Sequence, residues 1–168
     1  VSTAEGHDPA AAVAAFLALE AEGWKGRRGT ALSARPQTLR LVEEGIGSLL
    51  RSGQARIDSL LLDGRPIAAG VVLLSGSRAW YWKTAYDEAM SRFSPGVLLS
   101  HNIGAAVVAL PGVRLVDSCA IAGHPMIDRI WPERMTMTSR FIAVAEGEPG
   151  WRYRAALAIR RGLGEGKA

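Results

Sequence analysis

The feature that most constrains the fold is an uncharged segment, residues 95–110, that follows three closely spaced apolar runs. It opens with Ser94-Pro95-Gly96 and contains no Asp, Glu, Lys or Arg. Serine followed by proline is typical of a helix start, because the serine side chain can cap free amides and proline tolerates the first helical position. A helix without charges is expected to be buried on most of its surface. We therefore predict a helix that is capped by Ser94 and lies across a sheet.

Three strands are predicted before this helix, at residues 55–62, 66–74 and 78–86. Asp63-Gly64 separates the first two and is a strong hairpin dipeptide. Strands joined this tightly pair in antiparallel fashion. In the third strand, strict alternation would place one set of side chains on one face (Trp80, Trp82, Thr84, Tyr86) and another on the opposite face (Tyr81, Lys83, Ala85).

Further elements flank this meander. Helices are predicted from Asp8-Pro9 to Gly23, from Pro36 to Gly53, around 126–131 and at about 151–161, and strands at 113–119 and 134–144. The order indicates an α/β fold with a mixed sheet, in which an antiparallel three-strand meander is followed by a central helix, a parallel strand and a further helix and strand. We expect one domain over residues 1–168.

Composition excludes several classes of protein. The 48% hydrophobic and 21% charged residues are normal for a globular chain, and no apolar run approaches the roughly 18 residues of a membrane span. Most of the basic residues behind the net charge of +4 are arginines dispersed along the chain, which argues against DNA binding. Three scattered histidines predict no metal site. The single cysteine, Cys119, fits a reducing compartment, so we expect a cytoplasmic protein.

The start of the uncharged helix is the best candidate for an anion-binding site. The amides of Gly96, Val97 and Leu98 and the positive end of the helix dipole would meet there, and Gly96 would let a ligand approach closely. An ordinary helix cap explains the same residues, and their spacing alone favours the cap.

Four segments in this order resemble the GNAT superfamily of acyltransferases, and more narrowly the GNAT domains of CelD-like proteins associated with bacterial polysaccharide synthesis. They are residues 24–31, 63–69, 85–88, and Ser94-Pro95-Gly96 with Leu98-Leu99, and the resemblance spans about residues 13–142. The same family is similar to Fem-type aminoacyltransferases, which use aminoacyl-tRNA on a doubled GNAT scaffold.

The resemblance implies acetyl-CoA or another acyl-CoA as co-substrate and an amine or hydroxyl acceptor, either a small molecule or a saccharide. By this comparison Ser94, Gly96, Val97 and Leu98 would hold the pyrophosphate, and Lys83, Ala85 and Tyr86 would face the pantetheine arm. The usual loop is Gln/Arg-x-x-Gly-x-Gly/Ala. Residues 92–97 read Arg-Phe-Ser-Pro-Gly-Val, so the second glycine is missing and a proline removes one amide.

Two residues are candidates for proton transfer. Asp117 lies near the end of the strand after the central helix, where a base could reach the cleft; a turn or cap carboxylate is the alternative. His124 is the second candidate, because histidine is the side-chain type suited to proton transfer near neutral pH; a cap before Pro125 is its alternative.

Trp24, Lys25 and Arg28 are candidates for binding an anionic substrate at the rim of the site; a solvated loop with a packed Trp24 is the alternative.

Three hypotheses for function stay open. The first is an acyl-CoA-dependent acyltransferase, and the second is a GNAT-shaped module that binds a partner without catalysis, which the missing glycine favours. The third is one half of a doubled, Fem-type transferase. The chain begins at Val1 rather than Met, so we expect processing or a longer parent chain, with an upstream domain or a second copy of the chain as partner.

Overall fold

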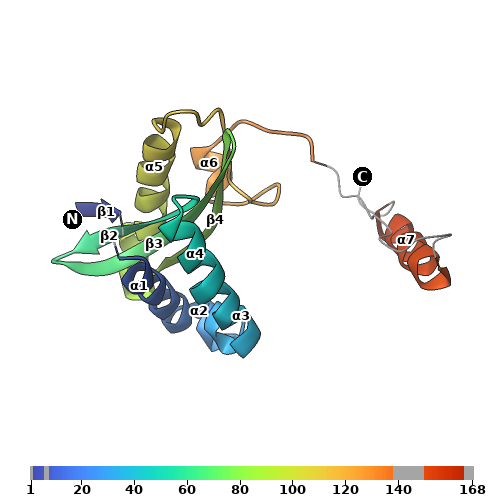
Figure 1. Cartoon of the computed structure of the whole chain (residues 1–168), viewed down its shortest axis with the longest axis horizontal. Coiled ribbons are helices and arrows are strands. Elements are labelled where there is room, and N and C mark those ends of the chain that lie inside the picture. Colours follow the sequence, from blue (N-terminus) through green and yellow to red (C-terminus); the bar gives the residue numbers. More distant parts are fainter. Residues whose placement is uncertain (1, 6–7, 138–149, 165–168) are drawn as a thin grey trace. The chain divides into compact units, whose positions relative to one another are not determined.

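The computed structural model describes residues 2–5, 8–137 and 150–164 (Figure 1). The chain divides into two compact units, Val1–Pro132 and Glu133–Ala168, and each is described by itself. The first unit holds the sheet and the candidate site.

The first unit is built on a five-stranded sheet in the order β1-β2-β3-β4-β5. The strands are β1 (Ser2–Glu5), β2 (Ala55–Leu62), β3 (Arg65–Ser75), β4 (Arg78–Tyr86) and β5 (Leu115–Asp117). Neighbours are antiparallel except β4 and β5, which are parallel. This confirms the predicted meander with a parallel strand after the central helix. Strand β1 was not predicted, because four residues carry too short an alternation to signal a strand.

The helices are α1 (Pro9–Glu22), α2 (Trp24–Arg27), α3 (Pro36–Arg40), α4 (Gly47–Arg51), α5 (Pro95–Val108), α6 (Ile127–Ile130) and α7 (Trp151–Gly164). Asp8 caps α1 as predicted, since its Oδ1 accepts the Ala10 amide at 3.0 Å. The second predicted helix is continuous from α3 to α4 through a π-helical turn, Leu41–Ile46. Short 3-10 helices cover Leu32–Ala34 and Glu88–Phe93.

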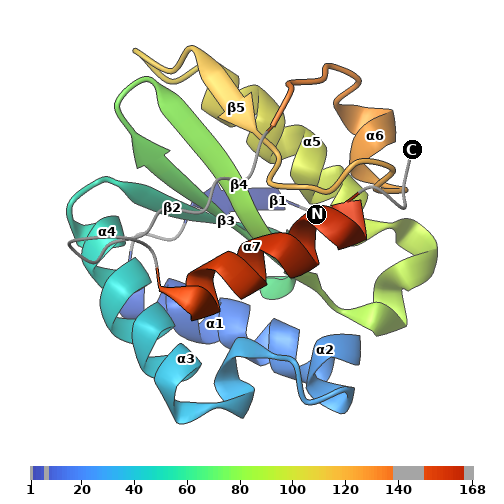
Figure 2. The ribbon, with the colours of Figure 1, turned by 90° about the vertical axis from the view of Figure 1, so that its right-hand side faces the viewer.

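Helices cover both faces of the sheet in the first unit, with α1, α3 and α4 on one side and α5 and α6 on the other (Figure 2). Each face has its own apolar cluster. The cluster beneath α1 includes Phe16, Leu17, Val42, Ile46, Ile57 and Val71. The cluster beneath α5 includes Ile67, Val72, Tyr81, Leu99, Ile103 and Val107.

Helix α5 lies across the sheet as predicted, but it is not buried on most of its surface. Leu99, Ile103 and Val107 recur every four residues and face the core, whereas Leu98 and Val108 on the outer side are 49% and 68% exposed. His101 and Asn102, two polar residues of this helix, are exposed as well. The helix forms the outer layer on this face of the sheet, so a single apolar stripe is enough to hold it against the sheet.

A β-bulge changes the faces of β4. Val72 pairs with Tyr81 and Val71 with Lys83, so Trp82 has no partner on β3. A bulge inserts one residue and reverses the alternation after it. Tyr81 and Thr84 therefore lie on the α5 face, where their hydroxyls meet, and Trp82 and Ala85 pack in the α1 cluster. The strict alternation predicted for this strand is wrong.

The rest of the chain follows the prediction in part. The strand expected at 113–119 is the shorter β5. Of the strand expected at 134–144, residues 134–137 have no regular structure and 138–144 lie outside the described residues. The Arg-rich helix is α7. Within the described ranges, no helix is both long and apolar enough to cross a membrane.

Candidate active site

The second half of β4 presents a free edge. Pairing with β5 covers only Arg78 to Trp80. The Asp87 amide donates to the Ile67 carbonyl at 2.8 Å, so the alternation of antiparallel pairing directs the backbone groups of Thr84 and Tyr86 away from β3. No other strand pairs with this edge in the part of the chain that the structure describes.

A small, open cleft of about 20 Å³ lies between this edge and the end of α1. It is lined from α1 and α2 by Leu19, Glu20, Gly23, Trp24 and Lys25, and from β4 and the residues after it by Thr84, Ala85, Tyr86 and Glu88. The sequence analysis predicted that Trp24 and Lys25 bind the substrate and that Ala85 and Tyr86 face the co-substrate. The structure places both pairs in the lining of one cleft.

The segment that carries Trp24 and Lys25 is held in place by its own backbone. Gly26 packs so tightly on α1 that a Cβ would lie 1.7 Å from the Ala21 carbonyl oxygen. The Lys25 carbonyl accepts the amides of Thr30 and Ala31 at 2.8 and 3.1 Å. The loop therefore folds back on itself and directs the Lys25 side chain toward the sheet.

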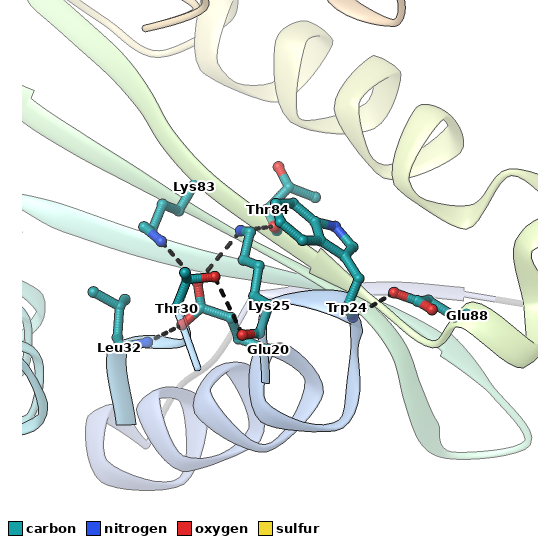
Figure 3. A network of polar contacts seen from close by, with 8 residues as sticks. All are labelled: Glu20, Trp24, Lys25, Thr30, Leu32, Lys83, Thr84 and Glu88. Carbon is teal, nitrogen blue, oxygen red and sulfur yellow. Dashed lines mark hydrogen bonds and ion pairs between the residues drawn. The ribbon is translucent and has the colours of Figure 1, made fainter. Parts of the chain in front are cut away.

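Glu20 lies at the centre of a polar network at the base of the cleft (Figure 3). Its side chain is fully buried, and its Oε1 accepts Lys83 Nζ at 2.7 Å and Lys25 Nζ at 3.3 Å. Its Oε2 accepts the Leu32 amide at 2.7 Å. Burial alone would raise the pKa of Glu20, but the hydrogen bonds from Lys83 and Leu32 and the two ammonium charges hold the pKa below its usual value.

Lys25 bridges the two walls of the cleft. Besides Glu20, its ammonium donates to the Thr84 carbonyl at 3.2 Å, on the free edge of β4. Burial and the neighbouring charge of Lys83 lower the pKa of Lys25, against the opposing effect of Glu20. Trp24 is 44% exposed beside it, and the Arg28 guanidinium lies 5.4 Å from the centre of the indole.

Glu88 fastens the rim of the cleft. Its Oε1 accepts the Trp24 amide and its Oε2 accepts Arg27 Nη2, both at 2.5 Å. These bonds lower the pKa of Glu88, the one from Arg27 most. The loop after β4 is thereby connected to α2 across the cleft.

The start of α5 differs from the predicted cap. Ser94 precedes the helix, but it adopts a left-handed conformation with φ of 51° and its hydroxyl makes no capping hydrogen bond. Its carbonyl instead accepts the amides of Val97 and Leu98 at 2.9 and 3.1 Å. A Cβ on Gly96 would lie 3.3 Å from the Tyr86 ring, so this glycine makes room for Tyr86. Of the three predicted anion-binding amides, two already have acceptors.

A buried chain of hydroxyls connects the free edge of β4 to α5. Thr84 Oγ1 donates to the Tyr81 hydroxyl, which lies 2.9 Å from Ser100 Oγ. Ser100 donates to the Gly96 carbonyl at 2.7 Å, so the Tyr81 proton must point to Ser100. Burial raises the pKa of Tyr81, and its hydrogen bonds with Ser100 and Thr84 only partly oppose this effect.

The two predicted proton-transfer residues lie apart from the cleft lining. Asp117 is paired with Trp80, at the point where β4 and β5 separate, and its Oδ1 accepts the Cys119 amide at 2.8 Å. His124 Nδ1 accepts the amides of Met126 and Ile127 at 3.4 and 3.2 Å, at the start of α6. No hydrogen bond joins Asp117 to His124 in the described residues, and no group of metal-ligating side chains occurs there.

The sequence analysis missed Glu20, Thr84 and Glu88. A signal existed for Glu20, because it is a carboxylate within the helical register of the buried residues Phe16 and Leu17. No local pattern distinguishes Thr84 or Glu88, since both act through partners about 60 residues away.

Comparison with known proteins agrees with this architecture. The sequence profile described as "Acetyltransferase (GNAT) domain" matches residues 2–124, whereas no curated protein sequence matches the chain significantly. Among solved structures, a possible acetyltransferase from Clostridium difficile 630 superposes with a TM-score of 0.62 at 10% identity, covering 86% of this chain and 98% of that one.

Two further structures were solved with ligands. An aminoglycoside acetyltransferase from an uncultured soil metagenomic sample, in complex with sisomicin, has a TM-score of 0.62 at 12% identity and covers 86% of this chain and 96% of its own. A GNAT-like decarboxylase, GphF, in complex with isobutyryl-CoA, has a TM-score of 0.50 at 18% identity, covering 69% of this chain and 64% of its own. At these identities the structures establish the fold, and the profile match over most of the sequence shows that the chain belongs to the GNAT acetyltransferase family, a class of enzymes that use acyl-CoA.

Proposed function

We propose that the chain transfers an acyl group from acyl-CoA to an amine or hydroxyl group of a small molecule or saccharide, in the cleft between α2 and β4. The observation that carries this proposal is the free edge of β4 at Thr84 and Tyr86, which borders a cleft with a partly exposed tryptophan and a lysine. A free strand edge is a template for a further extended chain, and the pantetheine arm contains two amide groups of that kind.

The residues of the edge fit the arm of acyl-CoA. The Thr84 carbonyl is occupied by Lys25, whereas the Thr84 amide and both backbone groups of Tyr86 are directed to the free side. Lys83 and Ala85, which we expected to face the arm, pair through their backbones with β3 and contribute by holding the strand. Bound acyl-CoA would supply an activated thioester carbonyl.

The start of α5 fits the pyrophosphate less fully. The helix dipole is the main support for a pyrophosphate there, because Gly96 is buried against Tyr86 and the amides of Val97 and Leu98 already bind the Ser94 carbonyl. Ser94 contributes its left-handed turn, which leads from the loop after β4 into Pro95 at the start of α5.

On the acceptor side, Trp24 offers a flat apolar surface and Lys25 and Arg28 offer donors. This combination suits a polyhydroxylated or amine-bearing acceptor. It agrees with the resemblance to CelD-like domains, so we propose an acceptor in polysaccharide or cell-envelope synthesis.

Asp117 is our proposed base, because β5 ends its pairing there and the two strands part beside it. Its present bond to the Cys119 amide leaves the second carboxylate oxygen for a proton. His124 is proposed as its companion; both of its amide contacts use Nδ1, so Nε2 remains for proton transfer.

The test is acetyl-CoA binding measured by calorimetry. Leu98→Asp places a negative charge on the exposed first turn of α5, and we expect it to weaken binding about tenfold. Val108→Asp adds the same charge at the exposed last turn and is the matched control, with unchanged affinity expected. Equal affinities for the two variants would contradict the proposed orientation of acyl-CoA.

A second candidate function is supported by the engaged amides of Val97 and Leu98. A GNAT-shaped module that binds a partner without catalysis needs no pyrophosphate site. No heat of binding with acetyl-CoA would favour that module, or a Fem-type half that takes its acyl group from aminoacyl-tRNA. Release of uncharged tRNA from an aminoacyl-tRNA donor would then distinguish the Fem-type half from the module.

A further inference from the structure

We propose that Lys25 binds a carboxylate of a substrate, carried either by the acyl chain or by the acceptor, so that this enzyme acts on a compound with a second, anionic group. The proposal rests on the proposed function, because it assigns a ligand to the same cleft. Four observations carry it.

The first is the charge balance around Glu20. Two ammonium groups share one oxygen of a single buried carboxylate, and Lys83 lies closer to it at 2.7 Å than Lys25 does at 3.3 Å. Lys83 is sufficient to neutralise Glu20. The structure therefore keeps one cation in excess, and the distances identify it as Lys25.

The second observation is the location of that cation. Lys25 lines the cleft, and 23% of its side chain is exposed. An ammonium has three donors, and Glu20 and the Thr84 carbonyl accept two of them. Among the described residues no third acceptor is recorded for it, and the centre of the Trp24 ring lies 5.9 Å from Nζ, so the third donor can meet a ligand that enters the cleft beside Trp24.

The third observation is that the neighbouring acidic group is already paired. Glu88 also lines the cleft, but its two oxygens bind Arg27 and the Trp24 amide. Within the described residues, Glu20 is the one carboxylate that pairs with Lys25. Arg28 adds a further positive charge above the Trp24 ring.

The fourth observation is the energetic state of Lys25. Burial and Lys83 both lower its pKa, which means that the charged form of Lys25 is costly at this site. A carboxylate ligand would remove that cost, because an ion pair with good hydrogen bonds offsets desolvation. A lysine with only a structural role would not need to add a second positive charge beside Glu20.

The geometry allows two sources for the carboxylate. Lys25 Nζ lies 3.2 Å from the Thr84 carbonyl, beside the edge proposed for the thioester arm, so it can reach the distal carboxylate of a dicarboxylic acyl group. The same ammonium borders the α2 side of the cleft, where the carboxylate of an amino acid acceptor would lie.

Calorimetry with acetyl-CoA and succinyl-CoA tests the first source. If the acyl chain carries the carboxylate, the wild-type chain binds succinyl-CoA at least about tenfold more tightly than acetyl-CoA, and Lys25→Gln reduces the ratio of the two affinities to about one. For the second source, thiol release is measured with amino acids and their carboxamides. An acceptor carboxylate lowers KM about tenfold relative to the amide, and Lys25→Gln removes the difference.

Controls separate the site from the fold. Lys25→Arg keeps the charge and should retain the preference, and Arg51→Gln removes an exposed charge on α4 and should leave it unchanged. Melting curves verify that each variant folds. If Lys25→Gln does not fold, the two ligand pairs still test the proposal on the wild-type chain, because equal handling of each pair would overturn it.

The outcomes are distinct from those of the proposed function. Equal handling of both ligand pairs by a chain that binds acetyl-CoA would overturn the carboxylate site alone. A chain that binds no CoA ester would overturn the proposed function. In that case free succinate would serve as the probe for the carboxylate site. A rise in melting temperature with succinate that Lys25→Gln abolishes would support the site, and no rise would overturn it.

Discussion

Gly26 lies against the carbonyl of Ala21 with no room for a side chain, since a Cβ at this position would be 1.7 Å from the oxygen. This contact folds α2 back onto the end of α1. The neighbouring Lys25 is thereby aimed at Glu20 and at the free edge of β4. The polar network of the cleft thus depends on the close backbone packing of Gly26 against Ala21.

Gly26→Ala is expected to destabilise the chain by about 1–3 kcal/mol, because the obstructing atoms are backbone atoms that cannot rotate away. Denaturant unfolding measures the loss. Gly45→Ala is the matched control, since its Cβ would meet only a Leu41 methyl group at 3.7 Å and alanine favours the helix. Equal stabilities of the two variants would show that the α1–α2 contact is not tight in solution.

Glu20→Gln should lower the free energy of unfolding by about 3 kcal/mol. This value lies at the lower end of the losses seen when one partner of a buried ion pair is removed, because both lysines are partly exposed. The amide still accepts the Leu32 proton but leaves two ammonium groups without a counterion. Added sulfate should restore part of the stability of this variant more than that of the wild-type chain. A variant as stable as wild type, with no response to anions, would contradict the network.

The contribution of Glu20 should depend on pH. Its folded pKa lies below the ordinary value of 4.5, so above pH 4.5 its full contribution to stability is present. The contribution is lost as the pH falls through the folded pKa, because the unfolded chain binds the proton more tightly. The difference in unfolding free energy between wild type and Glu20→Gln should therefore shrink below pH 4.5. A constant difference from pH 7 to pH 3 would exclude this linkage.

Tyr81→Phe should lower the unfolding free energy by about 1–3 kcal/mol, because Thr84 loses its acceptor and Ser100 its donor in a buried site. Combining it with Ser100→Ala gives a double-mutant cycle. The two losses should be less than additive, since each variant breaks the same hydrogen bond. Strict additivity would mean that the hydroxyls do not interact.

Glu88→Ala should loosen the rim of the cleft with little effect on the free energy of unfolding, because its pair with Arg27 is exposed. Hydrogen exchange of the Trp24 amide should become faster, since Glu88 is its acceptor. Glu44→Ala, on the π-helical turn, is the control and should leave this amide unchanged. Unaltered exchange in Glu88→Ala would show that the rim is held by other contacts.

The sequence by itself determined the elements whose signals are local. Asp63-Gly64 and the alternation around it set the strands β2 to β4 almost to the residue, and Asp8-Pro9 set the start of α1. A cap or a turn depends on a few adjacent residues, so it can be read without knowing the fold. The mixed sheet with its parallel last strand followed from the same elements in order.

Only the tertiary structure decided what the cleft contains. The bulge at Trp82 depends on the pairing of β4 with β3, and it turns Lys83 toward α1, where it meets Glu20 across 63 residues of sequence. The free edge at Thr84 exists because β5 pairs with only three residues of β4. Register and the end of pairing are properties of two strands together, and the pattern of one strand cannot determine them.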